Sequence, residues 1–299
     1  IELCLVGSEM CIRDRDVTLL PATDRYVSMV FQSYALFPHM NVLENVSYGL
    51  KMINVPKEEF TEKSLETLKL VNLEGYENRM PSELSGGQQQ RVAVARAIVL
   101  KPKVLLFDEP LSNLDAKLRR QVREDIREIQ QKLGVTTIYV THDQEEALAI
   151  SDKVIVMNNA IIAQQGSPKE LYNFPKTKFV ANFIGDANVV KAEIINQNNN
   201  IYEIQLAEMK INIESDQKLE SSVSVSLRPE KITISKSPEE NSIHASVNNA
   251  SFVGNSYQYI VNSKVGKIYV VSSDTNEIFN VGENVYLKFD EKELRLLDD

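Results

Sequence analysis

The sequence predicts an α/β core with an inserted helical region, followed by an all-β domain. Three observations indicate this fold class. Short, continuously apolar runs at residues 27–31, 103–107 and 135–140 are typical of parallel strands covered on both faces. Between the second and third runs, apolar residues recur at helical spacing. After Gly185 the pattern changes to short alternating runs divided by Asn, Ser and Gly.

Length and composition narrow the possible classes of protein. A chain of 299 residues with 43% hydrophobic residues favours two globular domains. The formal net charge of -9 argues against nucleic acid as a ligand, because phosphate-backbone contacts need clustered Lys and Arg. No apolar run is long enough to span a membrane and no secretory signal opens the chain, so we expect a soluble cytosolic protein. Cys4 and Cys11 are not expected to form a structural disulfide.

Residues 1–15 stand apart from the rest of the chain. They show no clear period, and the run CLVGSEMCIRDR is similar to the translation of a sequencing adapter. We therefore expect residues 1–15 to be a non-native segment. The expected domains are then an α/β domain at residues 16–185 and an all-β, barrel-like domain at residues 186–299.

Two helical regions are predicted within the α/β domain. A polar helical pattern predicts a helical subdomain at about residues 41–90, which separates Gln32 from Ser85 in sequence only. A second, amphipathic helix precedes the third apolar run and ends at Gly134. Its apolar positions are Leu114, Leu118, Val122, Ile126, Ile129 and Leu133.

The run Ser85, Gly86, Gly87, Gln88 predicts an anion-binding turn. Glycines let the main chain approach a phosphate closely, and the Gln-rich run after them begins a helix whose free N–H groups and dipole favour anions. The Ser85 hydroxyl adds a donor. The alternative interpretation is an ordinary Gly-Gly turn in front of a helix.

Two acidic residues follow the second apolar run. Asp108 lies where a buried strand emerges at the carboxyl edge of the sheet, and we expect it to be a ligand of Mg²⁺. Glu109 is the expected general base for an attacking water. The alternative is that both acids only cap the next helix.

His142 and Gln32 end the other two predicted strands. His142 is expected near the same edge, where its imidazole orients the water and contacts the terminal phosphate; the alternative is a surface or cap histidine. Gln32 offers a neutral amide to Mg²⁺ or to water. Residues 33–40 then form an aromatic-rich loop, which is either core packing or a surface for a partner.

These residues together resemble the ATP-binding subunits of ABC transporters. Gln32 matches the Q-loop of that family, residues 84–88 its signature, residues 104–109 its Walker B run, residues 112–115 its D-loop, and His142 its switch histidine. The sequence as given contains no G-x-x-x-x-G-K-[ST] run, so the resemblance is to an α/β P-loop-type core without its N-terminal part. We expect such a chain to be inactive alone.

The resemblance implies cofactors and partners. ATP is sandwiched in a head-to-tail dimer between the P-loop of one subunit and Ser85, Gly86, Gly87 and Gln88 of the other. Asp115 of the D-loop is assigned to nucleotide binding, Glu109 and His142 to catalysis, and Asp108 and Gln32 to Mg²⁺.

The run FQSYALFPHM at residues 31–40 resembles the importer branch, in which residues 32–40 contact the permease. The all-β tail is similar to the TOBE domains of importers for iron(III), polyamines, sulfate and sugars. Iron(III) or a polyamine is the favoured cargo, delivered by a periplasmic or lipoprotein solute-binding protein, with the ATPase at the cytoplasmic face of the inner membrane. Other classes left open are a sugar or anion importer, a soluble ABC ATPase, and a nonenzymatic regulatory module.

Overall fold

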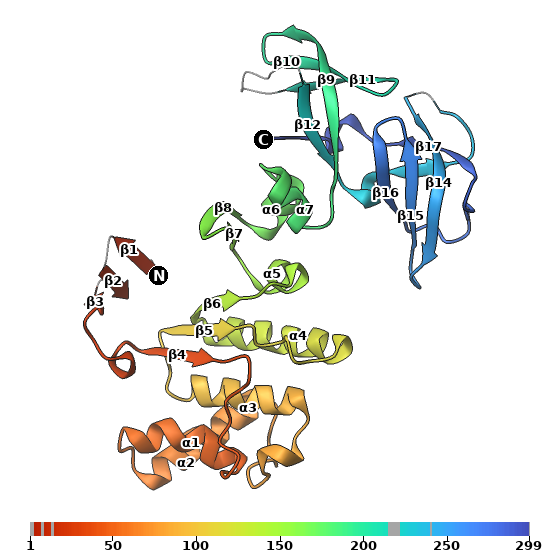
Figure 1. Cartoon of the computed structure of the whole chain (residues 1–299). Coiled ribbons are helices and arrows are strands. Elements are labelled where there is room, and N and C mark those ends of the chain that lie inside the picture. Colours follow the sequence, from red (N-terminus) through yellow and green to blue (C-terminus); the bar gives the residue numbers. More distant parts are fainter. Residues whose placement is uncertain (1–2, 7–8, 13–14, 215–221, 240, 299) are drawn as a thin grey trace. The chain divides into compact units, whose positions relative to one another are not determined.

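The structure is a computed structural model, which describes residues 3–6, 9–12, 15–214, 222–239 and 241–298. The chain divides into two compact units, Ile1–Ser151 and Asp152–Asp299 (Figure 1). The first contains a parallel sheet with helices. The second contains two five-stranded antiparallel sheets and a two-stranded antiparallel hairpin. An α/β core followed by a β-rich domain is therefore confirmed.

The first unit is built on a three-stranded parallel sheet. Its strands are β4 (Val27–Val30), β5 (Val104–Asp108) and β6 (Thr136–Val140), in the order β4-β5-β6. The register pairs Val27 with Val104, and Asp108 with Val140. Because the strands are parallel, their carboxyl ends meet at one edge of the sheet, which Figure 1 shows.

Helices cover one face of this sheet. The apolar sides of α3 (Gly86–Ile98) and α4 (Ala116–Leu133) share a buried cluster with Leu105 and Phe107 of the central strand. Helix α4 ends at Gly134, whose φ of 58° is left-handed and therefore suits glycine. The amphipathic helix is thus confirmed, with its start at Ala116.

The other face of the sheet is only partly covered by the described residues. Ile12 and Val17 pack on Val104 at one end. At the other end Ile138 and Val140 are 41% and 52% exposed. The apolar runs predicted cover on both faces, but an apolar run reports the strand itself and not the element that packs on it.

The helical subdomain contains α1 (Val42–Met52), α2 (Lys57–Leu70), the short 3₁₀ turn η2 (Pro81–Glu83) and α3. Helix α1 begins with a capping box in which Asn41 and Glu44 satisfy each other's main-chain N–H groups. Leu68 of α2 is fully buried in the cluster beneath α3. The remaining elements of this unit are β1 (Leu3–Val6), β2 (Glu9–Ile12), β3 (Arg15–Asp16), η1 (Ala22–Asp24) and α5 (Gln144–Ile150).

Part of the segment expected to be non-native is described as strands. The first three strands of the chain form a small antiparallel sheet. The side chains of Cys4 and Cys11 lie outside what the structure describes. The origin of residues 1–15 stays a prediction.

The second unit begins with a hairpin and two short helices, followed by ten strands. The first elements are β7 (Val154–Asn158), β8 (Ile161–Gly166), α6 (Pro168–Asn173) and α7 (Lys178–Phe183). One five-stranded sheet has the order β11-β10-β9-β12-β18, built from β9 (Asn188–Asn198), β10 (Ile201–Leu206), β11 (Met209–Glu214), β12 (Ser222–Leu227) and β18 (Arg295–Leu297). The other has the order β13-β17-β14-β15-β16, built from β13 (Thr233–Ser235), β14 (Ile243–Phe252), β15 (Tyr257–Ser263), β16 (Gly266–Ser272) and β17 (Asn284–Lys288), with the 3₁₀ turns η3 (Pro229–Lys231) and η4 (Glu291–Glu293) between strands.

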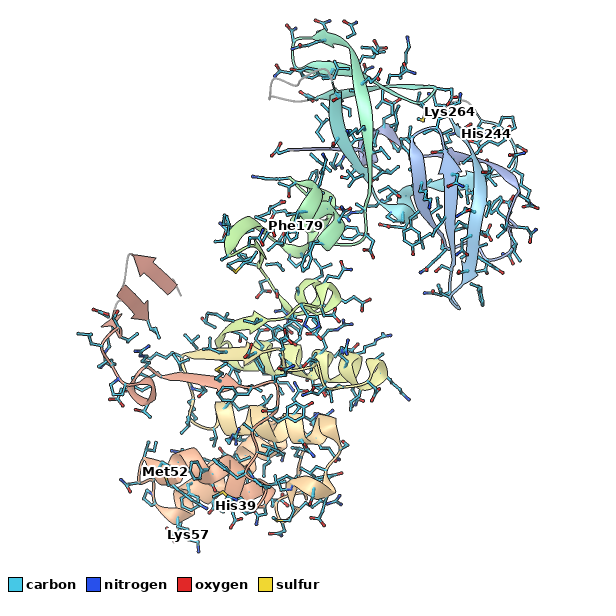
Figure 2. All side chains as sticks on the ribbon, viewed as in Figure 1. His39, Met52, Lys57, Phe179, His244 and Lys264 are labelled. Atoms are coloured by element: carbon cyan, nitrogen blue, oxygen red, sulfur yellow. The ribbon has the colours of Figure 1, made fainter. Side chains whose placement is uncertain are left out.

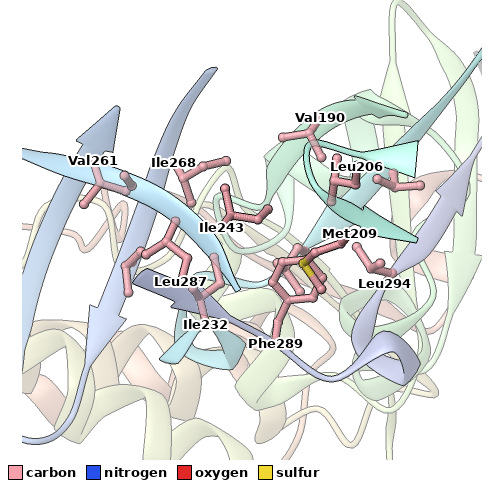
Figure 3. Packing of buried hydrophobic residues seen from close by; sticks show 14 of the residues in the cluster. Val190, Leu206, Met209, Ile232, Ile243, Val261, Ile268, Leu287, Phe289 and Leu294 are labelled. Atoms are coloured by element: carbon pink, nitrogen blue, oxygen red, sulfur yellow. The ribbon is translucent and has the colours of Figure 1, made fainter. Parts of the chain in front are cut away.

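The two five-stranded sheets share one apolar core. Alternate residues of β10, β14 and β17 are buried in this core, among them Leu206, Ile243 and Leu287 (Figure 3). The alternating runs in the sequence report this half-buried pattern directly. The β-rich C-terminal domain is therefore confirmed.

The packing places residues 152–185 with the β domain, whereas the sequence pattern suggested a boundary near residue 185. The guanidinium of Arg228 makes one set of the contacts that join these residues to the β domain. It is 7% exposed, donates hydrogen bonds to the carbonyls of Tyr172, Ala181 and Ile184, and lies 4.0 Å above the Tyr172 ring. Helices α6 and α7 are thereby attached to the start of η3.

Candidate functional site

The predicted site residues follow the carboxyl ends of the three parallel strands. Gln32 lies two residues after β4, Asp108 is the last residue of β5, Glu109 follows it, and His142 lies two residues after β6. Since β4, β5 and β6 are adjacent and parallel, the fold carries all three chain segments to the same edge. The edge is accessible, because Gln32, Asp108 and His142 are exposed.

Glu109 and His142 are in direct contact. His142 Nδ1 lies 3.0 Å from Glu109 Oε1, which leaves the second carboxylate oxygen of Glu109 for another partner. The hydrogen bond with Glu109, and then its negative charge, raise the pKa of the His142 imidazole. The main chain at Glu109 has a φ of 45°, and its N–H donates to the Val140 carbonyl at 2.9 Å. The Glu109 side chain therefore projects from a left-handed main-chain position that a hydrogen bond to β6 stabilises.

The glycine run starts helix α3, as predicted. Ser85 is the cap residue: its hydroxyl accepts from the Gln88 N–H, and the Gln88 side chain accepts from the Ser85 N–H at 2.9 Å. Within this cap the main-chain N–H groups at the helix start have no intrahelical acceptor, which suits an anion.

The two glycines also have a packing reason that the sequence did not indicate. A Cβ added at Gly87 would lie 2.8 Å from Leu118 Cδ1, and one at Gly86 would lie 3.0 Å from Leu114 Cδ2. The start of α3 is therefore pressed against α4 and the segment before it.

Comparison with known proteins identifies the family. The family described as "ABC transporter" matches residues 7–112, and the family described as "TOBE domain" matches residues 225–297. The chain is 48% identical to the Fe(3+) ions import ATP-binding protein FbpC of Agrobacterium fabrum, over 98% of this chain and 82% of that protein. The chain belongs to the ABC transporter ATP-binding proteins.

Other relatives carry the same name. The FbpC protein of Rhizobium etli is 47% identical over 98% of this chain and 82% of its own length. That of Photorhabdus laumondii is 46% identical over 94% of this chain and 79% of its own length. The first family match begins at residue 7, inside the segment 1–15.

In this ABC transporter ATP-binding protein, Asp115 is a helix cap. Its carboxylate Oδ1 accepts from the N–H groups of Lys117 and Leu118 at 3.1 and 3.0 Å at the start of α4. The other carboxylate oxygen remains for a further contact. The assignment of Asp115 to nucleotide binding stays a prediction.

The donor set at the strand ends fits Mg²⁺. Asp108 and Gln32 offer a carboxylate and an amide oxygen, and both side chains are exposed. Mg²⁺ binds through one or two protein oxygens and keeps water and phosphate for its other positions. The described residues contain no group of three or more His, Cys, Asp or Glu that would form an all-protein metal cage. These two residues would therefore hold the ion together with the nucleotide.

Sequence reasoning missed the residues that hold the His142 segment. Glu146 is 3% exposed and accepts from the Tyr139 hydroxyl at 3.0 Å and from the Thr141 hydroxyl at 2.8 Å. Burial, and then the charge of Glu146, raise the pKa of Tyr139. Arg119 of α4 lies 3.3 Å from Asp143 and 4.0 Å from Glu146. No sequence signal separates Glu146 from its neighbour Glu145, which is exposed.

Across the described residues, no helix combines the length and apolar character needed to cross a membrane.

Proposed function

We propose that this chain is the ATP-hydrolysing subunit that drives iron(III) uptake by an ABC importer. The contact between Glu109 and His142 at the sheet edge supports the hydrolytic role. The relatives named above, which are Fe(3+) import proteins by name, support iron(III) over a polyamine or a sugar.

Glu109 acts as the general base. His142 occupies Oε1, so the other carboxylate oxygen is available to accept a proton from water as that water attacks the terminal phosphorus, the bond from this phosphorus to the bridging oxygen breaks, and ADP leaves. His142 fixes the direction of the carboxylate, and its imidazole contacts the terminal phosphate. Asp108 and Gln32 would hold Mg²⁺, which when bound would offset the charge of the phosphates.

Ser85, Gly86, Gly87 and Gln88 act on a nucleotide held by a second subunit. Their helix start is capped and presents main-chain N–H groups, as an anion requires. Asp115 contacts the same nucleotide from the D-loop. A homodimer or a related pair of ATPase subunits follows from this arrangement.

The loop at residues 32–40, called here the 32–40 loop, is the proposed contact with the permease. Its Phe37 ring lies 4.6 Å from the Tyr48 ring of α1, while His39 is exposed. Met52, at the end of α1, is 60% exposed, and Figure 2 shows both His39 and Met52 in the helical subdomain. The subunit would then lie peripherally at the cytoplasmic face of the inner membrane, with a solute-binding protein as an indirect partner.

We also propose that the 299 residues alone do not turn over ATP, since no P-loop run occurs among them. Titration of the purified chain with ATP tests this point. Micromolar binding with hydrolysis would contradict it.

The full function is tested by restoring a P-loop. A strand and P-loop segment from an ABC transporter ATP-binding protein is joined in front of Asp16, and the grafted chain is assembled with permease and solute-binding protein in liposomes. We expect ATP-dependent uptake of radiolabelled iron(III), and none when the graft lacks its P-loop lysine. Uptake of a polyamine or a sugar in place of iron(III) would show that the proposed cargo is wrong.

A further inference from the structure

The 32–40 loop contains two neighbouring residues in an unfavourable main-chain conformation. Tyr34 has a φ of 61° and Ala35 a φ of 48°, both in the left-handed region that residues with a Cβ rarely adopt. The loop therefore does not hold this shape through local preference. Contacts from elsewhere in the first unit must select it.

Arg96 makes contacts with both of these residues. Its guanidinium donates to the Tyr34 carbonyl at 2.9 Å and to the Ala35 carbonyl at 2.6 Å, and lies 5.4 Å from the centre of the Phe37 ring. Burial lowers the pKa of this guanidinium, and among the described residues no carboxylate forms an ion pair with it. A planar fork of donors above a ring is specific to arginine.

Arg96 lies in the last turn of α3, the helix that begins at the signature glycines. Between Gly86 and Arg96 the helix rises by roughly 15 Å, at about 1.5 Å for each residue. The intervening residues Val92 and Ala95 are fully buried, so the helix is packed between its two ends and we expect it to transmit a displacement as one body. One end of α3 faces the proposed nucleotide contact and the other end holds the 32–40 loop.

Two further side chains fasten the ends of the same loop. The buried Asn45 amide accepts from the Phe37 N–H at 2.8 Å and donates to the Phe37 and Met40 carbonyls. Asn113, in the segment before α4, donates to the Gln32 carbonyl at 2.9 Å. Between these two anchors, Arg96 contacts the strained part of the loop.

We propose that Arg96 is a positioning residue that couples the signature helix to the 32–40 loop. It fixes Tyr34 and Ala35 in their left-handed conformation, so that a displacement of α3 on nucleotide contact is passed to the loop. This inference rests on the proposed function, because it takes the loop to be the contact with the permease.

The test compares Arg96→Lys with Arg79→Lys in the full chain. Lysine keeps the charge but not the fork, and Arg79 is a matched control because it lies 4.4 Å from the centre of the Tyr76 ring in the same subdomain. We expect Arg96→Lys to speed hydrogen exchange at the Tyr34 and Phe37 amides by about tenfold or more. Exchange within the buried part of α3 should not change, which shows that the variant is folded.

A second substitution tests the origin of the effect. Glycine adopts a positive φ without the penalty of a Cβ, so Ala35→Gly is expected to restore part of the exchange protection at Tyr34 in the Arg96→Lys chain. No restoration would mean that Arg96 does not hold the left-handed conformation. If Arg96→Lys is found to speed hydrogen exchange within α3 as well, the single variant Ala35→Gly becomes the test. We then expect slower hydrogen exchange at the Tyr34 amide in this variant than in the wild type, and unchanged exchange would overturn the inference.

Binding to detergent-solubilised permease separates the inference from the proposed function. We expect Arg96→Lys to weaken binding about tenfold and Arg79→Lys to leave it unchanged. Faster loop exchange with unchanged permease binding would overturn the positioning role. A wild-type chain that does not bind permease would overturn the proposed function, whereas unchanged loop exchange would overturn the inference on Arg96 alone.

Discussion

Two charged sites, one in each unit of the molecule, are built in opposite ways. In the first unit, the His142 side chain is 72% exposed and Glu109 is 30% exposed at the edge of the sheet. In the second unit, Arg228 is 7% exposed, and its hydrogen-bond acceptors are main-chain carbonyls. The first arrangement keeps charges accessible to a ligand. The second satisfies a charge so that two helices stay attached to a sheet.

The difference shows how chemistry and stability are separated in this protein. An exposed ion pair contributes little to the free energy of unfolding. A buried guanidinium contributes more, because removal of its contacts leaves carbonyls without donors. Changes at the sheet edge should therefore alter activity and leave stability nearly unchanged, and changes at Arg228 should do the reverse.

The largest expected effect is on catalysis. In the chain grafted with a P-loop, Glu109→Gln removes the proton acceptor, and ATP hydrolysis should fall by about a thousandfold. Glu145→Gln, at an exposed carboxylate near the same edge, is the matched control and should retain activity. A coupled-enzyme assay measures both. Similar rates for Glu109→Gln and the control would mean that Glu109 is not the base.

The next effect is on stability alone. Arg228→Met removes the donors to Tyr172, Ala181 and Ile184, and should lower the free energy of unfolding of the second unit by about 3 kcal/mol. Arg120→Met, on the exposed face of α4, should change the free energy by less than about 0.5 kcal/mol. Urea denaturation followed by circular dichroism measures the difference. An Arg228 variant as stable as the control would break the comparison between the units.

A smaller effect is expected where packing and the proposed nucleotide contact coincide. Gly87→Ala places a methyl group 2.8 Å from Leu118 Cδ1, and should lower the free energy of unfolding by about 1 to 2 kcal/mol. In a Leu118→Ala background the methyl group has room, so the same substitution should lower the free energy much less. Equal losses in both backgrounds, measured by urea denaturation, would exclude this contact as the reason for the glycine.

Two substitutions at Asp115 distinguish its role as a helix cap from its proposed role in nucleotide binding. Asp115→Ala should lower the free energy of unfolding by about 1 kcal/mol, since two N–H groups of α4 lose their acceptor. Asp115→Asn keeps an oxygen at the cap and should be close to the wild type. Thermal melting measures stability. In the grafted chain, reduced hydrolysis by the Asn variant would support the proposed contact with nucleotide, and unchanged hydrolysis would contradict it.

The smallest expected effect is on the pKa of the His142 imidazole. Glu109 raises the pKa of His142 above its ordinary value of 6.5, so the imidazole stays charged to a higher pH in the folded chain. Any stability from this pair is fully present below about pH 6.5 and is lost as the pH rises through the raised pKa. In an NMR titration, Glu109→Gln should lower the His142 midpoint, and Glu145→Gln should not. An unmoved midpoint would contradict the contact.

Regular patterns in the sequence predicted the main elements of the fold. Apolar runs identified β4, β5 and β6, and helical spacing with Gly134 identified α4. The alternating runs likewise indicated the β domain. The proximity of Glu109 and His142 followed from the rule that parallel strands end at one edge.

Other features of the structure could not be predicted, because no regular pattern in the sequence indicates them. Arg96 and Arg228 both donate to main-chain carbonyls, which every residue has, so no partner side chain indicated their roles. For the same reason no sequence signal indicated that residues 152–185 pack with the β domain. Glu146 differs from Glu145 only in burial, which depends on how α5 packs and not on local composition.

The main-chain acceptors of Arg228 also affect which substitutions this part of the protein can tolerate. A guanidinium that binds peptide oxygens places no requirement of its own on the side chains of residues 181 and 184, which are restricted instead by their burial at 0% and 1% exposure. The hydrogen bonds of Arg228 should therefore survive any substitution there that fits the core and keeps the backbone in place. The attachment of helices to the β domain should thus outlast much of the sequence similarity around it.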